Sequence, residues 1–308
     1  IKTVASEISE SISHIFNLIF LSGSIPDPLK VALVTPIFKE NEKNKFQNYR
    51  PISVITCFSK ILGKRMYRRL IKFIENNKIL TKHQYGFRHN RPTELAIIEL
   101  TDRIAKAIDK GEYTLGIFLD LSKAFDTINH KILIEKLEHY GIRGLAQHWF
   151  ENYLTNRKQI VKYNEVRSKE MTLRTGVPQG SILGPILFLL YINDIENSSK
   201  LLSFILFADD TTISCSNSCL KTLNITMQTE FNKVSEWLNV NKLSLNIKKT
   251  KFILFTSSNK KPKHEIKLSI NDGDIKQVKN TIFLGIIIDE CLTWSEHIAH
   301  VVKKISRA

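Results

Sequence analysis

Two adjacent aspartates interrupt an otherwise apolar stretch between Leu202 and Ser214. The stretch reads as two short strands that meet in a tight turn around Ala208, so Asp209 and Asp210 stand at the tip of a hairpin. Burying two carboxylates side by side is costly unless cations compensate their charge. The pattern therefore predicts a sheet that presents acidic groups at one end.

A third aspartate, Asp120, closes a second apolar strand that begins at Tyr113. One folded sheet can bring the ends of both segments together, which would gather three carboxylates. Each acid taken alone has a simpler explanation, because Asp120 can cap the segment starting at Leu121 and Asp209 with Asp210 can merely favour a turn. Taken together, the three carboxylates favour a metal site.

The rest of the chain alternates helices with strands. Apolar periodicity predicts helices at 1–24, 57–77, 93–110, 128–140, 145–156 and 220–239, and strands at 31–38, 159–163, 171–175, 252–256, 266–270 and 281–289. A further helix is expected after the Gly/Pro-rich loop near 184, and an Asn271-Asp272-Gly273-Asp274 turn joins the last two strands. With no internal repeat or linker, the pattern predicts an α+β fold in one continuous unit.

The formal charge of the 308 residues is +15. Fifteen Lys or Arg lie between Lys30 and Arg91, against the acids Glu40, Glu42 and Glu75, so most of the excess falls in one subdomain. A run of charge often marks only a solvated helix face. An excess of this size also indicates a polyanionic partner, either a nucleic acid or a membrane surface.

Several features bear on the compartment. The longest apolar run, 182–192, is broken by Gly184 and Pro185 and is too short to cross a bilayer, so we expect no membrane segment. Of the two polyanionic partners, we expect nucleic acid and no membrane. We find no secretory signal, and the absence of an initial Met predicts a fragment. The four cysteines are scattered without a CxxC pair or neighbouring His, which argues against a zinc site or a disulfide framework. We expect an intracellular protein of the cytoplasm and nucleus, not a secreted one.

Three segments in order resemble the palm motifs of reverse transcriptases: Phe118 to Asp126, Gly176 to Ser181, and Phe207 to Asp210. The flanking segments 48–53 and 181–185 resemble the branch without long terminal repeats (LINE-type), in particular the jockey-like mobile elements of animals. The resemblance covers about residues 15–289. Several ordered motifs are far more specific than a single match.

The resemblance implies a right-hand polymerase fold of the α+β class. It would comprise an N-terminal helical extension at 1–24, a reverse transcriptase domain at 25–289 and the start of a truncated thumb at 290–308. Within the domain, basic fingers would run from about 25 to 111 with a later insertion, and the palm would be an antiparallel sheet backed by helices.

The resemblance also implies a catalytic site. Asp120, Asp209 and Asp210, with the backbone carbonyl of Leu121, would hold two Mg²⁺ ions, for which Mn²⁺ can substitute. Lys249 matches the lysine that donates a proton to the departing pyrophosphate. Its neighbour Lys248 competes for the same role.

Further residues would bind the incoming nucleotide. Phe125 would lie under its sugar and exclude a 2′-hydroxyl, while Gln179 and Gly180 would contact the nucleotide and template. Arg50 and Lys39 would grip the triphosphate. Without the resemblance, Phe125 reads as core packing, Gln179 as part of a helix-entry loop, and the two cations as solvated charges.

Two more motifs would contact the nucleic acid. A fingers motif near the template contributes Gln84, Gly86, Phe87 and Arg88, and a hairpin that grips the primer end contributes Phe283, Leu284 and Gly285. Two departures from the family affect the fingers. Leu29 replaces a Trp that is common there, and 39–42 replaces a Lys-Lys-Gly sequence. The palm motifs are unaltered.

These features predict an RNA-directed DNA polymerase that uses deoxynucleoside triphosphates to extend a DNA or RNA primer 3′-hydroxyl on an RNA template, in retrotransposition. The endonuclease that acts on target DNA is expected elsewhere in the full element. A domesticated or decayed copy that binds RNA without polymerising is the main alternative. A two-metal nuclease is another, but its chemistry gives no reason for Gln179, Phe125 and a fingers domain to occur together.

Overall fold

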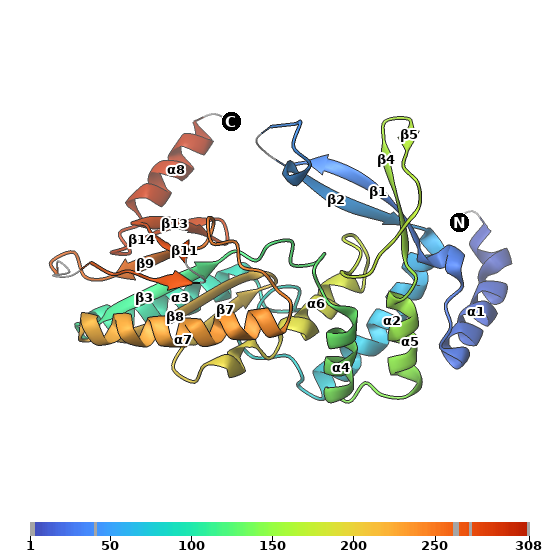
Figure 1. Cartoon of the computed structure of the whole chain (residues 1–308), viewed down its shortest axis with the longest axis horizontal. Coiled ribbons are helices and arrows are strands. Elements are labelled where there is room, and N and C mark those ends of the chain that lie inside the picture. Colours follow the sequence, from blue (N-terminus) through green and yellow to red (C-terminus); the bar gives the residue numbers. More distant parts are fainter. Residues whose placement is uncertain (1–3, 40–41, 261–264, 271–272, 307–308) are drawn as a thin grey trace. The chain divides into compact units, whose positions relative to one another are not determined.

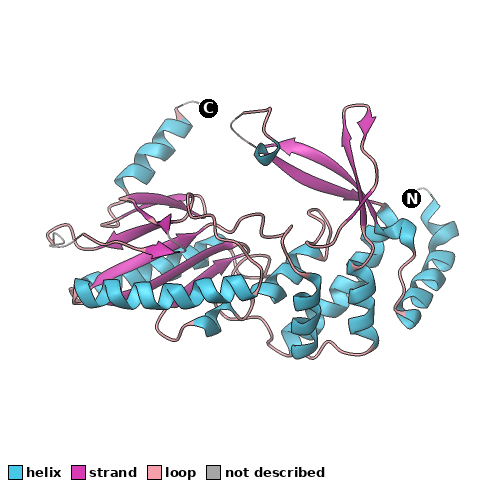
Figure 2. Cartoon of the chain, in the orientation of Figure 1, coloured by secondary structure: helices cyan, strands magenta, loops and turns pink. Residues whose placement is uncertain are grey.

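The computed structural model describes residues 4–39, 42–260, 265–270 and 273–306, which form helices and sheets in two compact units. The first unit comprises Ile1–Leu80 and Phe125–Ile192, and the second comprises Thr81–Ala124 and Asn193–Ala308. Figure 1 labels the elements of each unit and Figure 2 colours them by type. Each unit therefore contains two separate stretches of the chain.

The first unit combines a small sheet with helices. Its helices are α1 (Ala5–Ser22), α2 (Cys57–Asn76), α4 (His130–His139), α5 (Leu145–Leu154) and α6 (Gly184–Ile192), with short 3-10 turns at Asp27–Lys30 and Phe46–Asn48. Its strands are β1 (Val31–Phe38), β2 (Tyr49–Ile55), β4 (Lys158–Tyr163), β5 (Val166–Arg167) and β6 (Met171–Thr172). The strand β1 runs antiparallel to β2 and parallel to β4.

Local sequence explains the main helices of this unit. The Thr56 hydroxyl caps α2 by accepting the Ser59 N–H at 3.2 Å. The helix then buries an apolar stripe and exposes its basic residues, the arrangement expected of an amphipathic helix. Nearly every residue of α6 is buried, so the longest apolar run of the chain forms a core helix. Among the helices described, none is long and apolar enough to span a membrane.

The second unit is built on a sheet in the order β12-β9-β3-β8-β7. Its strands are β3 (Tyr113–Leu119), β7 (Ser203–Phe207), β8 (Asp210–Asn217), β9 (Lys251–Phe255) and β12 (Lys276–Gln277). The helices α3 (Thr93–Asp109) and α7 (Leu220–Val240) pack on it, and in Figure 1 α7 lies on the near side and α3 on the far side. The central strand β3 is buried almost throughout because both faces of the sheet are covered.

A hydrophobic cluster packs on the far face of this sheet. It joins Leu100 and Ile104 of α3 to Ile253 and Phe255 of β9 and to Phe283. Phe283 ends β13 (Asn280–Phe283), which pairs with β14 (Ile286–Asp289). The remaining elements are the 3-10 turn η4 (Ile195–Ser198), the small pair β10 (Ser269–Ile270) and β11 (Gly273–Asp274), and α8 (Ser295–Ile305).

Most predicted elements are confirmed, and the differences have physical causes. The strand β2 was not predicted; it includes Pro51, which a sheet tolerates at an edge such as this one. Residue pattern predicted a single strand at 281–289, whereas the structure has the hairpin that the resemblance implied there, since Leu284 and Gly285 both adopt positive φ. The strand expected at 266–270 is short, and the Asn271-Asp272 part of the turn lies outside the described residues.

The helix α3 also lies in a different place from the one expected. The sequence assigned 81–111 to the fingers together with the basic helix α2. The structure places this stretch in the second unit, because α3 packs its buried Ala96, Leu100 and Ile104 on β3 and β7.

Candidate active site

Three carboxylates gather where β3 and β8 end. The antiparallel ladder ends with Leu119 opposite Thr211, so continuing the register sets Asp120 opposite Asp210. Asp209 lies in the tight turn between β7 and β8, next to Ala208, whose φ of 57° is left-handed. The sheet therefore brings all three predicted metal ligands to one end.

The environment of Asp210 includes the other two carboxylates. Asp210 is exposed at the surface, yet its pKa is raised to about 6. The larger cause is partial loss of hydration, and the smaller cause is the negative charge of Asp209 and Asp120. Among the residues that the structure describes, no three His, Cys, Asp or Glu side chains are already arranged to hold a metal ion. The donor set is nevertheless of the hard oxygen type that Mg²⁺ prefers.

The backbone around Asp120 is fixed by the segment that follows α7. The Asp120 N–H donates to the hydroxyl of Thr250 at 3.2 Å, and the Asp120 carbonyl accepts the Asn246 N–H at 2.8 Å. The Ser122 N–H donates to the Ser244 carbonyl, also at 2.8 Å. Thr250 is fully buried, so Asp120 is anchored on a rigid part of the unit.

The same contacts position two other predicted residues. Leu121 forms a bridge with Leu245, and the hydrogen bonds of that bridge use the backbone groups of the flanking residues rather than the Leu121 carbonyl. The Lys249 N–H donates to the Asn246 carbonyl at 3.1 Å, and the side chains of Lys248 and Lys249 are both exposed. Their exposure does not distinguish the two lysines.

Phe125, in the first unit, is half-buried. Its ring lies 4.7 Å from that of Phe188, centroid to centroid, with the planes tilted by 31°. Its carbonyl accepts the Val177 N–H at 2.9 Å. The ring is therefore packed on one side, as the core interpretation requires, and still partly accessible, as a contact with a nucleotide requires.

Gln179 is held between two other motifs of the first unit. Its side-chain N–H donates to the Asp126 carboxylate at 2.8 Å, and its backbone carbonyl accepts the Ser53 N–H at 2.7 Å. Gly180 has a φ of 104°, and a Cβ there would lie 2.9 Å from the Ser53 carbonyl, so only glycine fits easily. The sequence interpretation missed the role of Asp126, although this residue ends the first palm motif.

Arg50 and Lys39 lie on the hairpin of β1 and β2. Arg50 pairs with Ile37 in the strand register, and the Lys39 N–H donates to the Asn48 carbonyl at 2.8 Å. Both residues are exposed. The segment that departs from the family, 39–42, lies partly outside the described residues.

The Gln84 to Arg88 motif is placed differently from the expectation. Gln84 is 1% exposed and Gly86 is buried, both against the turn that carries Asp209. Phe87 is exposed, while the Arg88 guanidinium donates to the Thr81 carbonyl at 2.7 Å. Contact with nucleic acid stays a prediction for Phe87 and Arg88, whereas Gln84 and Gly86 are occupied in packing.

The predicted primer hairpin divides in a similar way. Phe283 is buried and makes an edge contact with Phe118 at 5.8 Å between ring centroids. Leu284 and Gly285 form the turn, and Gly285 is exposed. The turn of the hairpin, rather than Phe283, is therefore the part that nucleic acid can reach.

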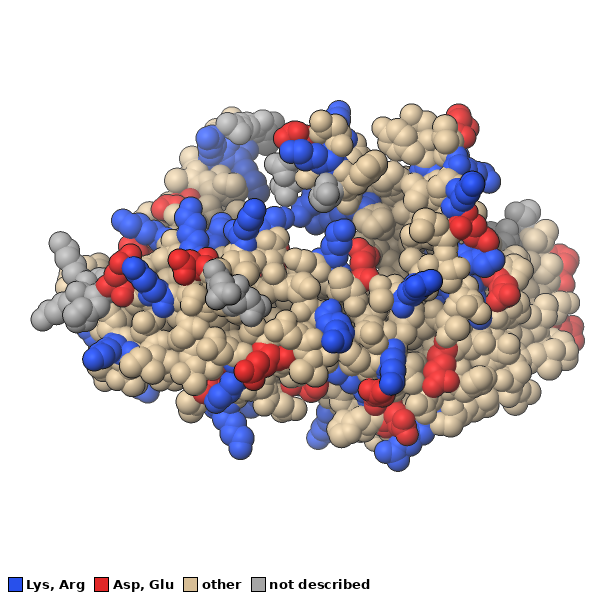
Figure 3. All heavy atoms as spheres, in the orientation of Figure 1, with Lys and Arg blue, Asp and Glu red and all other residues tan. Residues whose placement is uncertain are grey.

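Basic residues line the exposed side of α2 in the first unit, which we call the α2 basic face: Lys60, Lys64, Arg65, Arg68, Arg69 and Lys72. The Arg69 guanidinium also lies 4.4 Å from the centre of the Phe20 ring. On the face of the molecule in Figure 3, Lys and Arg are more abundant than Asp and Glu.

Comparisons with known proteins identify the family of this chain. Residues 39–288 match the family described as reverse transcriptase (RNA-dependent DNA polymerase). The chain is 28% identical over 298 residues to a probable RNA-directed DNA polymerase from the transposon X-element of Drosophila melanogaster, covering 94% of this chain and 32% of that protein. It is 26% identical to the RNA-directed DNA polymerase from the mobile element jockey of Drosophila funebris, covering 92% and 31%. The chain thus spans about a third of the length of these relatives.

The fold is also similar to a solved structure. An apo telomerase from Candida tropicalis, truncated from its C-terminal domain, superposes with a TM-score of 0.58 at 13% identity. The match covers 88% of this chain and 55% of that one. At this identity the likeness concerns the fold alone.

Proposed function

Because this chain belongs to the reverse transcriptase (RNA-dependent DNA polymerase) family, we propose that it extends a DNA or RNA primer 3′-hydroxyl on an RNA template, using deoxynucleoside triphosphates. The predicted resemblance to jockey-like elements and the predicted α+β polymerase fold are both confirmed. We also propose that the full-length element uses this activity in retrotransposition, with an endonuclease supplied by another part of that protein.

One observation carries the proposal. The register of β3 and β8 sets Asp120 opposite Asp210, with Asp209 in the adjoining turn, on a sheet whose backbone is fixed around Asp120. An RNA-binding protein has no need for three carboxylates at one end of a sheet, since they repel phosphates. A nucleotidyl-transfer enzyme does need them.

In this proposal, Asp120, Asp209 and Asp210, with the Leu121 carbonyl, would hold two Mg²⁺ ions, for which Mn²⁺ could substitute. Such ions, when bound, favour deprotonation of the primer hydroxyl and neutralise the leaving pyrophosphate. Lys249 then donates a proton to the pyrophosphate oxygen.

The nucleotide and the nucleic acid are assigned to other groups. Gln179, fixed by Asp126 and Ser53, contacts the incoming nucleotide, and Arg50 with Lys39 binds its triphosphate. The α2 basic face binds phosphates of the template. Because it acts on an RNA template and on target DNA, we propose that the working protein is found in the cytoplasm and nucleus.

Primer extension tests the proposal. Purified chain, a labelled DNA primer on an RNA template, deoxynucleotides and Mg²⁺ should give extended products. Asp209→Asn should abolish extension while leaving RNA affinity nearly unchanged, because it removes negative charge from the metal site and leaves the basic surface intact. Wild-type protein that binds RNA but extends no primer would favour the decayed RNA-binding copy. An Asp209→Asn variant with wild-type rates would refute the metal site.

A further inference from the structure

The segment 83–86 pairs with the outer edge of β7. The Tyr85 N–H donates to the Leu206 carbonyl at 2.7 Å, and the Leu206 N–H donates to the His83 carbonyl at 2.9 Å. These bonds accompany a parallel bridge between Gln84 and Leu206. The segment therefore covers an edge strand of the sheet three residues before Asp209.

Gln84 reaches from this bridge to the turn itself. Its side-chain oxygen accepts the Ala208 N–H at 3.0 Å and the Gly86 N–H at 2.8 Å. Two N–H donors fix the orientation of the carboxamide, since a flipped amide would set N–H against N–H. Ala208 has a left-handed φ, which non-glycine residues seldom adopt, and Gln84 stabilises that conformation directly before Asp209.

Gly86 fills the remaining space beneath the turn. A Cβ at this position would lie 2.2 Å from the Ala208 nitrogen and 2.8 Å from the Phe207 carbonyl carbon. Both are backbone atoms, so the clash cannot be relieved by rotating a side chain. Any side chain at 86 must displace the turn that carries Asp209.

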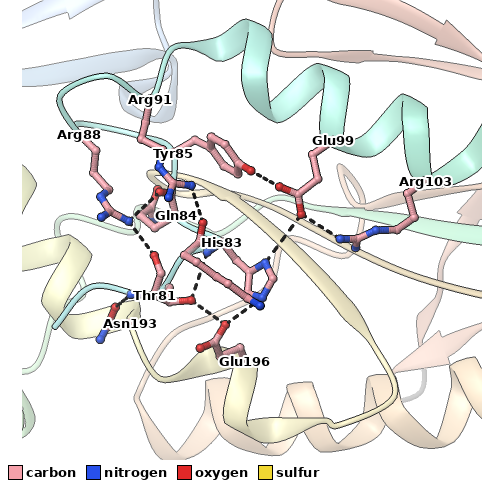
Figure 4. Close-up of polar contacts among 11 residues, drawn as sticks. Thr81, His83, Gln84, Tyr85, Arg88, Arg91, Glu99, Arg103, Asn193 and Glu196 are labelled. Atoms are coloured by element: carbon pink, nitrogen blue, oxygen red, sulfur yellow. Dashed lines mark hydrogen bonds and ion pairs between the residues drawn. The ribbon is translucent and has the colours of Figure 1, made fainter. Parts of the chain in front are cut away.

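The segment is in turn anchored at its start. The Thr81 N–H donates to the Asn193 side chain at 2.8 Å, and the Thr81 hydroxyl donates to Glu196 at 2.6 Å. The Arg88 guanidinium closes the loop by donating to the Thr81 carbonyl. Figure 4 shows these contacts converging on the short segment.

A second set of contacts joins the segment to α3. The His83 ring lies between Glu99 of α3, at 3.8 Å, and Glu196, at 3.6 Å, and the Tyr85 hydroxyl donates to Glu99. Arg103 pairs with the same carboxylate at 2.8 Å. Figure 4 shows Glu99 and Glu196 on either side of the His83 ring. Gln84 and Gly86 therefore stand on a rigid support rather than on a loose loop.

We propose that Gln84 and Gly86 are positioning residues that set the place of Asp209 in the catalytic site. The proposal rests on the proposed function, since it concerns the carboxylate assigned to the metal. In this proposal Gln84 and Gly86 support the turn that carries Asp209, instead of contacting the template as their motif predicted. A displacement of about 1 Å in a catalytic group can cost about a hundredfold in rate, so a rigid turn here has a large effect.

Gly86→Ala is the direct test, with Gly63→Ala as its matched control. The added methyl group at 86 meets the backbone of the turn, whereas a Cβ at Gly63, inside α2, has nothing within 4 Å. We expect Gly86→Ala to lower kcat by about a hundredfold and to weaken binding of Mn²⁺, measured by electron paramagnetic resonance. RNA affinity should stay near the wild-type value. Gly63→Ala should match the wild type in all three.

Gln84→Met provides a second route, because it keeps the approximate length of the side chain and removes the acceptor oxygen. The amide nitrogen, which is lost as well, is buried and makes no hydrogen bond to any residue that the structure describes. Like Gly86→Ala, it should lower both kcat and Mn²⁺ affinity. If Gly86→Ala does not fold, Gln84→Met alone tests the proposal. Circular dichroism would give the folded fraction. If both variants lower only the melting temperature, while kcat per folded molecule and Mn²⁺ binding match Gly63→Ala, the positioning role is wrong. Failure of the proposed function would look different, since the wild type itself would neither extend primers nor bind Mn²⁺.

Discussion

At the scale of single residues, Phe125 bears most directly on nucleotide choice. Its ring is half-buried against Phe188. If it also excludes a 2′-hydroxyl, steric overlap of about 1–3 kcal/mol corresponds to roughly ten- to hundredfold discrimination. Phe125→Ala should therefore raise the use of ribonucleotides relative to deoxynucleotides by about that factor, measured in single-nucleotide extension.

Phe188→Ala is the matched control for this prediction. Phe188 is fully buried on the other side of the ring contact, so its truncation should cost about 3–5 kcal/mol of stability and depress both nucleotide types alike. If Phe125→Ala behaves like Phe188→Ala, with a lower melting temperature and an unchanged preference ratio, Phe125 is a core residue.

Asp126 offers a second prediction at this scale. Its carboxylate accepts the side-chain N–H of Gln179 at 2.8 Å, and a hydrogen bond to a charged group contributes about 1.5–3 kcal/mol. Asp126→Ala should raise KM for the nucleotide by roughly tenfold or more without weakening RNA binding. Asp126→Asn keeps an acceptor oxygen and should restore part of the loss. Equal loss of nucleotide and RNA affinity would instead indicate a general folding defect.

Residue patterns predicted the candidate ligands but not their surroundings. The aspartates at 120, 209 and 210 were identified because carboxylates at the ends of apolar strands are unusual in a sequence. The burial of Gln84 could not be predicted, because nothing near it in the sequence indicates that its partner is the Ala208 N–H, 124 residues away. A hydrogen bond between distant segments leaves no local periodicity.

At the scale of elements, the same distinction holds. Helix α2 and strand β1 were predicted almost residue for residue, because a 3.6-residue pattern and a short apolar run are both visible in the local sequence. The strand β2 was missed; it pairs with β1, with Pro51 opposite Pro36, and its own sequence does not specify this contact with another segment. The unit to which α3 belongs depends on which sheet its apolar side covers, a contact that its own sequence does not specify.

A buried carboxylate on α7 provides a prediction at this scale. Glu230 accepts hydrogen bonds from Lys233 and from Ser199, both at 2.6 Å, and these contacts, Lys233 first, lower its pKa from 4.5. A lowered folded-state pKa stabilises the fold above the unfolded value and loses that contribution as the pH falls through the folded value. The contact between Glu230 of α7 and Ser199, the residue after η4, should therefore weaken below about pH 4.5.

Glu230→Gln should lower stability at pH 7 by about 1–3 kcal/mol and flatten the fall in stability below pH 4.5. Urea denaturation at several pH values would measure both effects. The exposed Glu236 of the same helix is the control, since Glu236→Gln should leave the curve unchanged. A Glu230→Gln curve parallel to the wild type at low pH would contradict the assignment.

At the scale of the whole molecule, charge is the dominant property. The net charge of +15 and the α2 basic face predict RNA binding driven by release of condensed counterions. The logarithm of the affinity should then fall linearly with the logarithm of the salt concentration, by about 0.7 to 0.9 for each phosphate contacted. Fluorescence anisotropy with a labelled RNA at several salt concentrations would give the slope.

Two triple variants separate the α2 basic face from the total charge. Replacing Lys64, Arg68 and Lys72 by Gln removes three charges from one side of α2, where residues four apart are neighbours. Replacing Lys106, Lys131 and Lys158 removes the same number, but these lysines are paired with Asp102, Glu135 and Glu170. If the α2 basic face binds phosphates, only the first variant should reduce the slope, by about two to three. Equal reductions would mean that the net charge of the chain, and no particular surface, attracts the RNA.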